Sequence, residues 1–341
     1  MKIIVTGACG FIGSHLVDFC LSEGHDVLAI AKPGVELVNL RHLIQAEGKE
    51  PPASFELQQV DVRDAKTMAD VIERFEPDGI FHMAAQSYVQ PSWENPAETF
   101  DTNINGTVNV FEPVKKLGLK TRIVVACSSA EYGTITEDDV PIKETLPLQA
   151  LHPYGISKIG QDLLARQYFM NFGIDTVRLR YFNQTGIRKV KDACADFATK
   201  IAEIDAGKSD PEIHVGNLET QRDIQDIRDT VKATWLAFTS AEKGEVYNVC
   251  TGVPTRIRDV LETLKGMASV DIIVIEKTEA KMRFQDEPII LGDNSRFKVA
   301  TGYEPDYKIE DTLRSMFDYW KGYYSADDPA NYYQSFYLKN I

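Results

Sequence analysis

The chain begins Met1-Lys-Ile-Ile-Val-Thr-Gly7-Ala-Cys-Gly10-Phe-Ile-Gly13, a short apolar run that ends in a glycine-rich turn. The run predicts a buried strand, and the residues after Gly10 predict a helix that begins within the turn. Glycines at such a turn let the backbone approach a pyrophosphate, and the helix N-terminus offers it free N–H groups. The spacing is one residue longer than the usual dinucleotide fingerprint. Because the turn closes the first strand–helix unit, we predict a cofactor site at Gly7, Gly10, Phe11, Ile12 and Gly13.

The pattern of the first turn continues through the first half of the chain. Buried strands are predicted at Ile3–Thr6, Val27–Ala31, Phe55–Val60, Gly79–Met83, Arg122–Cys127 and Thr176–Tyr181, and helices near 12–22, 65–75, 98–117 and 154–172. Alternation of this kind is typical of a parallel sheet covered on both faces. With right-handed crossovers it predicts an α/β fold with a doubly wound Rossmann core.

After Asn183 the alternation becomes irregular. Helices are predicted near 194–206, 226–240, 256–267 and 309–321, and Tyr247–Cys250 is expected to return to the sheet. We therefore predict an NAD(P)-binding Rossmann domain over residues 1–183, to which 226–250 returns, and a smaller, interleaved C-terminal substrate lobe over 184–341. The tail from Trp320 to Ile341 is rich in aromatic residues, and we expect it to pack on its own subunit rather than form an oligomer contact.

Composition excludes several classes of function. The net charge of −14 argues against a broad nucleic-acid surface and gives no reason to expect binding to anionic lipid. No apolar run approaches the roughly 20 residues of a membrane span, and the first residues read as a strand rather than a signal peptide. The five cysteines are scattered without metal-ligand spacing. We therefore expect reduced thiols, no metal site and a cytoplasmic protein.

The ends of the next strands indicate which nicotinamide cofactor binds. An acidic residue at the end of the second strand would hold the ribose hydroxyls of NAD, but Ala31 and Lys32 stand there and no carboxylate is nearby. A cation suits a 2′-phosphate, so NADP(H) is preferred and NAD(H) is possible; the alternative is that Lys32 is an ordinary surface lysine. Asp61 and Val62 are placed to meet the adenine. Ala84 and Ala85 are small residues where the cofactor lies against the sheet edge.

Tyr154 and Lys158 are four residues apart, which places phenol and ammonium on one face of a helix. A nearby cation favours the ionised form of a phenol, so Tyr154 is a candidate proton donor or acceptor. The alternative is an amphipathic helix with a buried tyrosine and a solvated lysine. Ser128 lies upstream, at the end of the predicted fifth strand.

Motifs along nearly the whole chain resemble the extended short-chain dehydrogenase/reductases that act on nucleotide sugars. They are the opening turn, His82-Met-Ala-Ala-Gln-Ser87, Asn103-Ile-Asn-Gly-Thr107, Cys127-Ser-Ser-Ala-Glu-Tyr-Gly133, the Tyr154/Lys158 pair, Arg180-Tyr-Phe-Asn183-Gln-Thr-Gly186, Arg222-Asp223-Ile-Gln-Asp226, Tyr247-Asn-Val249 and Arg283-Phe-Gln-Asp286-Glu-Pro288. The chain is most similar to the GDP-mannose 4,6-dehydratases and their sister reductases, which convert GDP-4-keto-6-deoxymannose to GDP-rhamnose.

The resemblance implies a role for each matching residue. Tyr154 protonates the substrate oxygen as hydride reaches its carbon. Lys158 holds the nicotinamide ribose and lowers the pKa of the phenol, and Ser128 donates a hydrogen bond to the same oxygen. Asn103 organises the helix that carries Lys158. The implied substrate-binding set is Ser87, Ser128, Asn183, Arg222 and Arg283, in which the arginines hold the nucleotide diphosphate.

Two positions favour reduction over dehydration. The dehydratases of the family carry an acid/base glutamate two residues before the tyrosine that Tyr132 matches, and this chain has Ala130 there, with Glu131 one residue later. A one-residue shift can turn a side chain to the opposite face. Ser128 also replaces the family's threonine. We therefore predict an NADPH-dependent reductase of a nucleotide-linked 4-keto-6-deoxy sugar. The alternatives are a 4,6-dehydratase or 4-epimerase with tightly bound NAD(P), and a non-catalytic nicotinamide-binding regulator.

Two further expectations concern the loop after Gly186 and the oligomer. The family usually has proline after this glycine, whereas this chain continues Ile187-Arg188-Lys189, so Arg188, Lys189 and Lys191 either engage phosphate or are exposed loop charges. By resemblance, the helices near 98–117 and 154–172 form a homodimer through a four-helix bundle.

Overall fold

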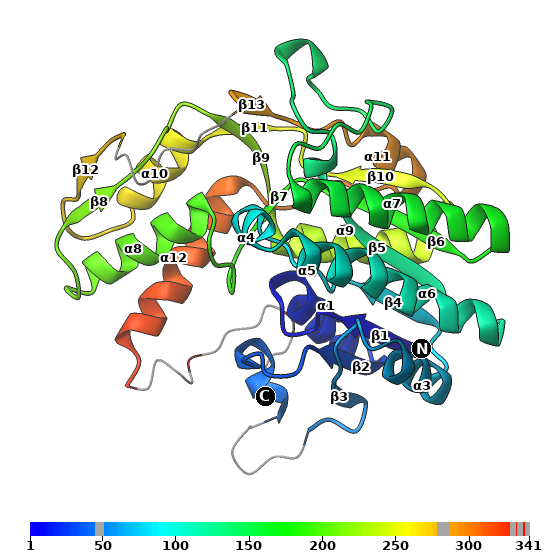
Figure 1. The fold of residues 1–341 in the computed structure, drawn as a ribbon. Coiled ribbons are helices and arrows are strands. Elements are labelled where there is room, and N and C mark those ends of the chain that lie inside the picture. The colour runs from blue at the N-terminus through cyan, green and yellow to red at the C-terminus, as the bar shows by residue number, and fades with distance from the viewer. Residues whose placement is uncertain (45–50, 278–286, 328–331, 333–336, 338–341) are drawn as a thin grey trace.

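The computed structural model describes residues 1–44, 51–277, 287–327, 332 and 337 of the chain. A seven-stranded sheet runs through it in the order β10-β6-β5-β4-β1-β2-β3, and all neighbouring strands are parallel (Figure 1). The strands are β1 (Lys2–Thr6), β2 (Asp26–Ala31), β3 (Phe55–Gln59), β4 (Gly79–His82), β5 (Arg122–Ser128), β6 (Thr176–Tyr181) and β10 (Val246–Val249). This strand order confirms the doubly wound Rossmann prediction.

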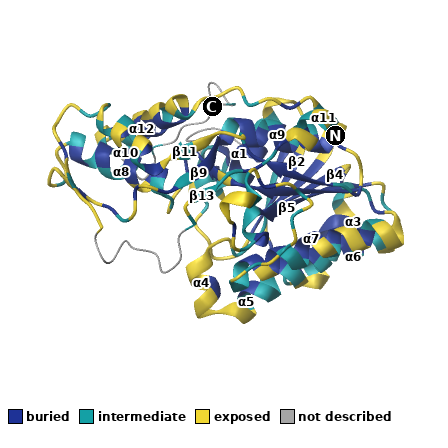
Figure 2. Ribbon diagram, turned by 90° about the horizontal axis from the view of Figure 1, so that it is seen from above, coloured by how far each residue is buried: buried dark blue, intermediate teal, exposed yellow. Residues whose placement is uncertain are grey.

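Helices cover both faces of the sheet (Figure 2). One face carries α1 (Phe11–Ser22), α9 (Ile227–Ser240) and α11 (Ser295–Thr301), and the other carries α3 (Ala65–Phe75), α6 (Gly106–Leu117) and α7 (Pro153–Phe172). Strands enclosed in this way are buried on both sides, and all six residues of β6 are buried, Arg178 and Arg180 among them. The predicted helix at 98–117 comprises α5 (Pro96–Phe100), a wider helical turn at Asp101–Asn105 and α6.

A second apolar cluster lies beside the sheet, within a group of three helices. These are α8 (Ala193–Asp205), α10 (Ile257–Lys265) and α12 (Ile309–Ser325), and the short parallel pair β8 (Glu212–His214) and β12 (Ile273–Ile275) lies next to them. A small sheet connects this group to the large one through β7 (Asn183–Thr185), β9 (Gln221–Asp226), β11 (Pro254–Arg256) and β13 (Ile289–Ile290). The remaining short helices are α2 (Arg41–Ile44) and α4 (Val89–Glu94).

The chain returns from this lobe to the large sheet, because α9 packs on the sheet and β10 pairs with β6. The prediction for Tyr247–Cys250 is thereby confirmed within one residue, while the division at residue 183 stays a prediction. In the tail, Tyr337 contacts the rings of Phe19 and His15, and Tyr332 contacts Tyr319. These two tail residues pack on their own chain. None of the helices in the described ranges is long and apolar enough to cross a membrane.

Candidate active site

The glycine turn after β1 lies against the end of β4. Gly7 has a φ of +66°, and a Cβ on it would lie 2.8 Å from the backbone nitrogen of Ala84. A Cβ on Gly13 would lie 2.2 Å from the carbonyl oxygen of Gly7, so only glycine lets the helix begin this close to the strand. Gly10 is exposed and directly precedes Phe11, the first residue of α1. The turn therefore presents free N–H groups at a helix N-terminus, as a pyrophosphate requires.

The other predicted cofactor residues follow neighbouring strands of the sheet. Lys32 follows β2, Asp61 and Val62 follow β3, and Ala84 and Ala85 follow β4. Carboxyl ends of parallel strands meet at one edge of a sheet, and β1 and β4 are neighbours where the strand order reverses. The structure thus brings these residues to the same edge as the glycine turn, and Ile12 is half-buried in the first turn of α1.

Charged side chains of both signs surround this edge. Nζ of Lys32 lies 3.4 Å from Oε1 of Glu98, a carboxylate that α5 brings to the end of β2. Arg63 forms a two-pronged hydrogen bond with Asp61, 2.7 Å at its shorter distance, and lies 3.9 Å from both Glu98 and Asp101. The hydrogen bonds from Arg63 hold the pKa of Asp61 below its ordinary value. Arg63 is not among the predicted site residues, although its position two residues after Asp61 was a usable signal.

The structure brings Ser128, Tyr154 and Lys158 together. Ser128 is the last residue of β5, and the other two lie on the first turns of α7. Nζ of Lys158 donates a hydrogen bond to the backbone oxygen of Ala126 at 2.8 Å and lies 5.9 Å from the centre of the Tyr154 ring. A phenol, a hydroxyl and an ammonium therefore converge where β5 meets α7.

Burial controls the protonation of this group. It raises the pKa of Tyr154 to about 12, while bonding to the Ser128 hydroxyl opposes the rise. Burial also lowers the pKa of Lys158 to about 8, against the attraction of Cys127 and Glu131. The expectation that the neighbouring cation lowers the phenol pKa is therefore wrong, because desolvation of the phenolate raises it. Tyr154 is protonated at neutral pH, as a proton donor must be.

His152 is a neighbour that the sequence analysis did not single out. Its ring stacks on the Tyr154 ring with centroids 5.9 Å apart and an interplanar angle of 12°. Its Nδ1 accepts the backbone N–H of Gly155 at 3.0 Å, which caps the N-terminus of α7. The pair His152-Pro153 ahead of the tyrosine was the available signal, since proline favours the first helical position.

Asn103 lies in the wider helical turn before α6. Its Nδ2 donates a hydrogen bond to Oγ of Ser157 at 2.8 Å and to the backbone oxygen of Gln86 at 3.0 Å. Ser157 directly precedes Lys158 in α7. Asn103 is therefore tied to the helix that carries Lys158.

Glu131 points into the core. Its side chain is fully buried, and its Oε1 accepts the backbone N–H of Ser128 at 2.8 Å. Its Oε2 lies 3.2 Å from Nε of Arg180 without the alignment of a hydrogen bond. Burial and the nearby Asp162 raise the pKa of Glu131 to about 8, and Arg180 opposes the rise. Glu131 thus closes the turn that follows Ser128.

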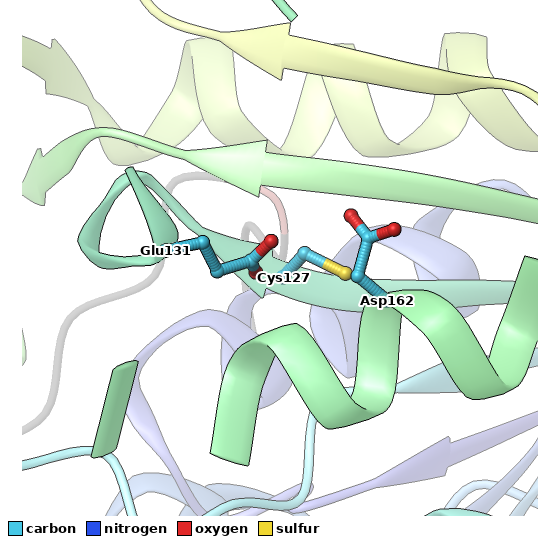
Figure 3. A group of neighbouring side chains, drawn as sticks. All are labelled: Cys127, Glu131 and Asp162. Atoms are coloured by element: carbon cyan, nitrogen blue, oxygen red, sulfur yellow. The ribbon is translucent and has the colours of Figure 1, made fainter. Parts of the chain in front are cut away.

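Cys127, Glu131 and Asp162 lie close together beneath this turn (Figure 3). Their geometry resembles a small metal-ligand set, but guanidinium groups already neutralise the carboxylates. Arg178 donates to Oδ1 of Asp162 at 2.5 Å, and Arg180 donates to Oδ2 at 3.0 Å. Burial raises the pKa of the Cys127 thiol, which disfavours the thiolate that binds metal. The group is a charge-paired part of the core.

The predicted substrate residues lie on different elements. Asn183 and Arg222 are on the neighbouring strands β7 and β9, and Asn183 is exposed, with its Nδ2 3.2 Å from the backbone oxygen of Asp223. Arg222 is largely buried and donates to the backbone oxygen of Glu287 at 2.8 Å. Ser87 is exposed after β4. Arg283 lies outside the described residues.

Neither alternative for Arg188 is correct. Its side chain is 1% exposed and donates to Oδ2 of Asp18 at 2.6 Å and to Oγ of Ser14 at 3.1 Å. These interactions hold the loop after Gly186 against helix α1. The ammonium of Lys189 lies 5.0 Å from the centre of the Phe11 ring, beside the glycine turn.

Comparison with known proteins places this geometry among nucleotide-sugar enzymes. The sequence model of a family described as GDP-mannose 4,6 dehydratase matches residues 4–316. A GDP-6-deoxy-D-mannose reductase from Pseudomonas aeruginosa is 28% identical over 321 residues, covering 94% of this chain and 97% of that protein. A CDP-paratose 2-epimerase from Salmonella typhi is also 28% identical, covering 94% and 99%. The solved structure of RMD from Pseudomonas aeruginosa complexed with NADPH superposes with a TM-score of 0.81 at 26% identity, covering 94% of this chain and 99% of that one.

Proposed function

Since the chain belongs to the GDP-mannose 4,6-dehydratase family, we propose that it is an NADPH-dependent reductase of a nucleotide-linked 4-keto-6-deoxy sugar, of the type that converts GDP-4-keto-6-deoxymannose to GDP-rhamnose. Family membership confirms the prediction of an enzyme and sets aside a non-catalytic regulator. The reaction itself is the proposal.

The position of Glu131 is the observation that carries this proposal. A dehydratase needs a carboxylate that reaches the sugar, and Glu131 is the only acidic residue between Ser128 and Gly133. Its oxygens are directed to the N–H of Ser128 and to Arg180, and its side chain is fully buried. Ala130, at the position where the dehydratases carry their glutamate, has no acid/base group. Reduction requires only hydride and one proton, which the site can supply.

The residues around Tyr154 suit the delivery of that proton. When bound, the reduced nicotinamide supplies hydride to C4 of the sugar. The phenol of Tyr154, whose pKa burial raises to about 12, is protonated at neutral pH and donates its proton to the C4 oxygen, which completes the alcohol. The Ser128 hydroxyl donates a hydrogen bond to the same oxygen and stabilises the charge that develops there. Lys158 holds the nicotinamide ribose.

The edge of the sheet supports a preference for NADP(H), with NAD(H) possible. The glycine turn from Gly7 to Gly13 would hold the pyrophosphate. Asp61 and Val62 would meet the adenine, and the small side chains of Ala84 and Ala85 would let the cofactor lie against the sheet edge. Lys32 and Arg63 offer two cations at the ends of β2 and β3, where a 2′-phosphate would lie. The NADPH complex of the structural relative points in the same direction.

The substrate is proposed to be a nucleotide diphosphate sugar held by Ser87, Asn183, Arg222 and Arg283. The exposed side of α7 supports a homodimer, because Ile156, Leu163 and Met170 follow one another at intervals of seven residues and are 48%, 52% and 61% exposed. A second copy would cover this stripe in a four-helix bundle.

Turnover of purified protein with NADPH tests the proposal. A panel of 4-keto-6-deoxy sugars linked to GDP, UDP, dTDP and CDP should include one that consumes NADPH. Tyr154→Phe should abolish this turnover and leave NADPH binding largely intact, which separates chemistry from cofactor binding. Failure of every sugar would overturn the proposal. Turnover of a nucleotide sugar without added nicotinamide would instead identify a dehydratase or epimerase that recycles tightly bound cofactor.

A further inference from the structure

A line of buried polar side chains runs inside the sheet, from the cofactor turn to the catalytic helix. Thr6 at the end of β1, His82 at the end of β4 and Thr107 in α6 are all fully buried. Nδ1 of His82 lies 2.9 Å from Oγ1 of Thr6, and Nε2 lies 3.0 Å from Oγ1 of Thr107. Both ring nitrogens are therefore bonded, one toward each end of the line.

The partners of Thr107 determine which ring nitrogen carries the proton. The Thr107 hydroxyl lies 2.6 Å from the backbone oxygen of Asn103, which can only accept, so its single hydrogen is directed there. Nε2 of His82 must then be the donor to Thr107, and Nδ1 must accept from Thr6. Thr6 in turn accepts the backbone N–H of Ala84 at 3.2 Å. One pattern of donors satisfies every group, with His82 neutral and protonated on Nε2.

The charge state of His82 agrees with this pattern. Burial, with a smaller contribution from Lys158, lowers the pKa of His82 to about 3. An imidazolium would present two donors and lose the hydrogen bond from Thr6. The ring is therefore neutral at neutral pH and keeps the Nε2–H tautomer that its hydrogen bonds require.

The two ends of the line reach the two halves of the site. At the cofactor end, Ala84 is the residue against which Gly7 packs, since a Cβ on that glycine would lie 2.8 Å from the Ala84 nitrogen. At the catalytic end, Asn103 donates to Ser157, the residue before Lys158. Gln161, one turn further along α7, donates to Thr107 at 2.8 Å. The line thus spans from the pyrophosphate turn to the helix of Tyr154 and Lys158.

We propose that His82, as its Nε2–H tautomer, is a positioning residue. It holds the glycine turn at a fixed position relative to the helix of Tyr154 and Lys158, so that the hydride donor and the proton donor face one carbonyl group. Its effect on turnover rests on the proposed reductase function. Its effect on cofactor binding does not, because the line contacts the turn that receives the pyrophosphate.

Three variants test the role of the ring. His82→Leu removes both hydrogen bonds, and His82→Gln retains an acceptor and a donor at about the separation of the ring nitrogens. Thr121→Val is the matched control, because it removes one fully buried hydroxyl that donates to Pro77 at the opposite edge of the sheet. We expect His82→Leu to weaken NADPH binding about tenfold and to lower kcat about 100-fold, with the sugar KM nearly unchanged. His82→Gln should recover most of both losses, and Thr121→Val should show neither.

Two further measurements separate positioning from packing. In a cycle of Thr6→Val and Thr107→Val, the double variant should weaken NADPH binding about as much as either single variant, because each breaks the same line. Nitrogen-15 NMR of the histidine ring should show the proton on Nε2 at neutral pH. A proton on Nδ1, fully multiplicative effects in the cycle, or wild-type NADPH affinity in His82→Leu would each overturn the proposal.

NADPH affinity and the tautomer are measured without any sugar, by cofactor fluorescence and NMR. If no 4-keto-6-deoxy sugar is reduced, the reductase proposal fails while this test remains valid. If His82→Leu binds NADPH as the wild type does and sugar reduction is observed, the positioning role fails while the reductase proposal stands.

Discussion

Two groups of charged side chains flank the candidate site, and they differ in burial. The buried charge cluster lies beneath Ser128 and consists of Glu131, Asp162, Arg178 and Arg180, all at most 6% exposed. The exposed charge cluster lies at the ends of β2 and β3 and consists of Lys32, Asp61, Arg63, Glu98 and Asp101, with side chains 22% to 47% exposed. Both combine carboxylates with cations, at 2.5 to 3.2 Å in the buried charge cluster and at 2.7 to 3.9 Å in the exposed charge cluster.

The difference shows what each cluster can do. Removing one partner of a buried ion pair leaves an uncompensated charge without water, so the buried charge cluster holds its members in place. Glu131 thereby holds the turn after Ser128 instead of reaching the sugar. An exposed ion pair is worth little, because water and salt replace either partner. Lys32 and Arg63 are therefore available to an anionic group of the cofactor.

The largest effect is expected from Arg180→Met, which removes the buried hydrogen bonds from Arg180 to Asp162, to the Tyr132 hydroxyl and to the backbone oxygen of Glu144. It should lower the free energy of unfolding by about 3–5 kcal/mol, measured by urea denaturation. Arg258→Met is the matched control, since Arg258 is partly exposed and pairs with Glu219 and Glu276. It should leave the free energy of unfolding close to the wild-type value. Equal losses in the two variants would contradict the distinction between the clusters.

Glu131→Gln tests the same cluster through pH. Burial and Asp162 raise the pKa of Glu131 from an ordinary 4.5 to about 8, so the unfolded chain releases this proton first as pH rises. The free energy of unfolding of the wild type minus that of the variant should therefore decrease by about 2 kcal/mol or more as pH rises from 4.5 to 8. Glutamine keeps an acceptor for the N–H of Ser128, so reductase turnover should persist.

Glu112→Gln should change the pH dependence of stability in the opposite direction. The hydrogen bond from Lys115 holds the pKa of Glu112 below its ordinary value, so its contribution is present above pH 4.5 and is lost as pH falls. Wild-type stability relative to this variant should decrease toward acid. The same pH trend in both variants, or complete loss of turnover in Glu131→Gln, would count against the assignment of Glu131 to the core.

Much of the Rossmann half could be predicted from the sequence, because its signals are local. The run Ile3–Thr6, the glycines of the first turn and the four-residue spacing of Tyr154 and Lys158 each act within one strand or helix. The shift of Glu131 by one residue predicted that its side chain would not take the place of the dehydratase glutamate, and in the structure that side chain is buried beside Arg180. These features depend on backbone periodicity, which a sequence displays directly.

The remaining features depend on partners that are distant in the chain. Arg188 is buried because Asp18 lies across the α1 interface, and no pattern near Arg188 indicates this. The pKa of Tyr154 is raised by desolvation in the whole fold and is not lowered by the lysine one turn away. The strands β7, β11 and β13 have only two or three residues each, too few to show alternation.

In the exposed charge cluster, Lys32→Met and Arg63→Met should each weaken NADPH binding about tenfold. NADH has no 2′-phosphate, so its affinity should change little, and unfolding free energies should stay within about 0.5 kcal/mol of wild type. Fluorescence titration with each cofactor measures the ratio of the dissociation constants for NADPH and NADH. Equal losses of affinity for NADPH and NADH would show that these cations do not bind the 2′-phosphate.

The smallest effect is expected from Glu98→Gln, which removes the carboxylate nearest to both cations. NADPH should bind about threefold more tightly at low salt, because Lys32 and Arg63 no longer have to leave the Glu98 carboxylate to bind the 2′-phosphate. The gain should shrink in high salt, where the exposed pairs are screened. Weaker NADPH binding in this variant would indicate that Glu98 supports the cofactor site.

Transfer of deuterium tests the central claim most directly. NADPH labelled at C4 of the nicotinamide is incubated with the enzyme and GDP-4-keto-6-deoxymannose, and the product is analysed by mass spectrometry and NMR. A reductase with Tyr154 as its acid places one deuterium at C4 of the sugar for each NADPH consumed, and Tyr154→Phe places none. Conversion of a nucleotide sugar without label in the product and without net consumption of NADPH would contradict the account.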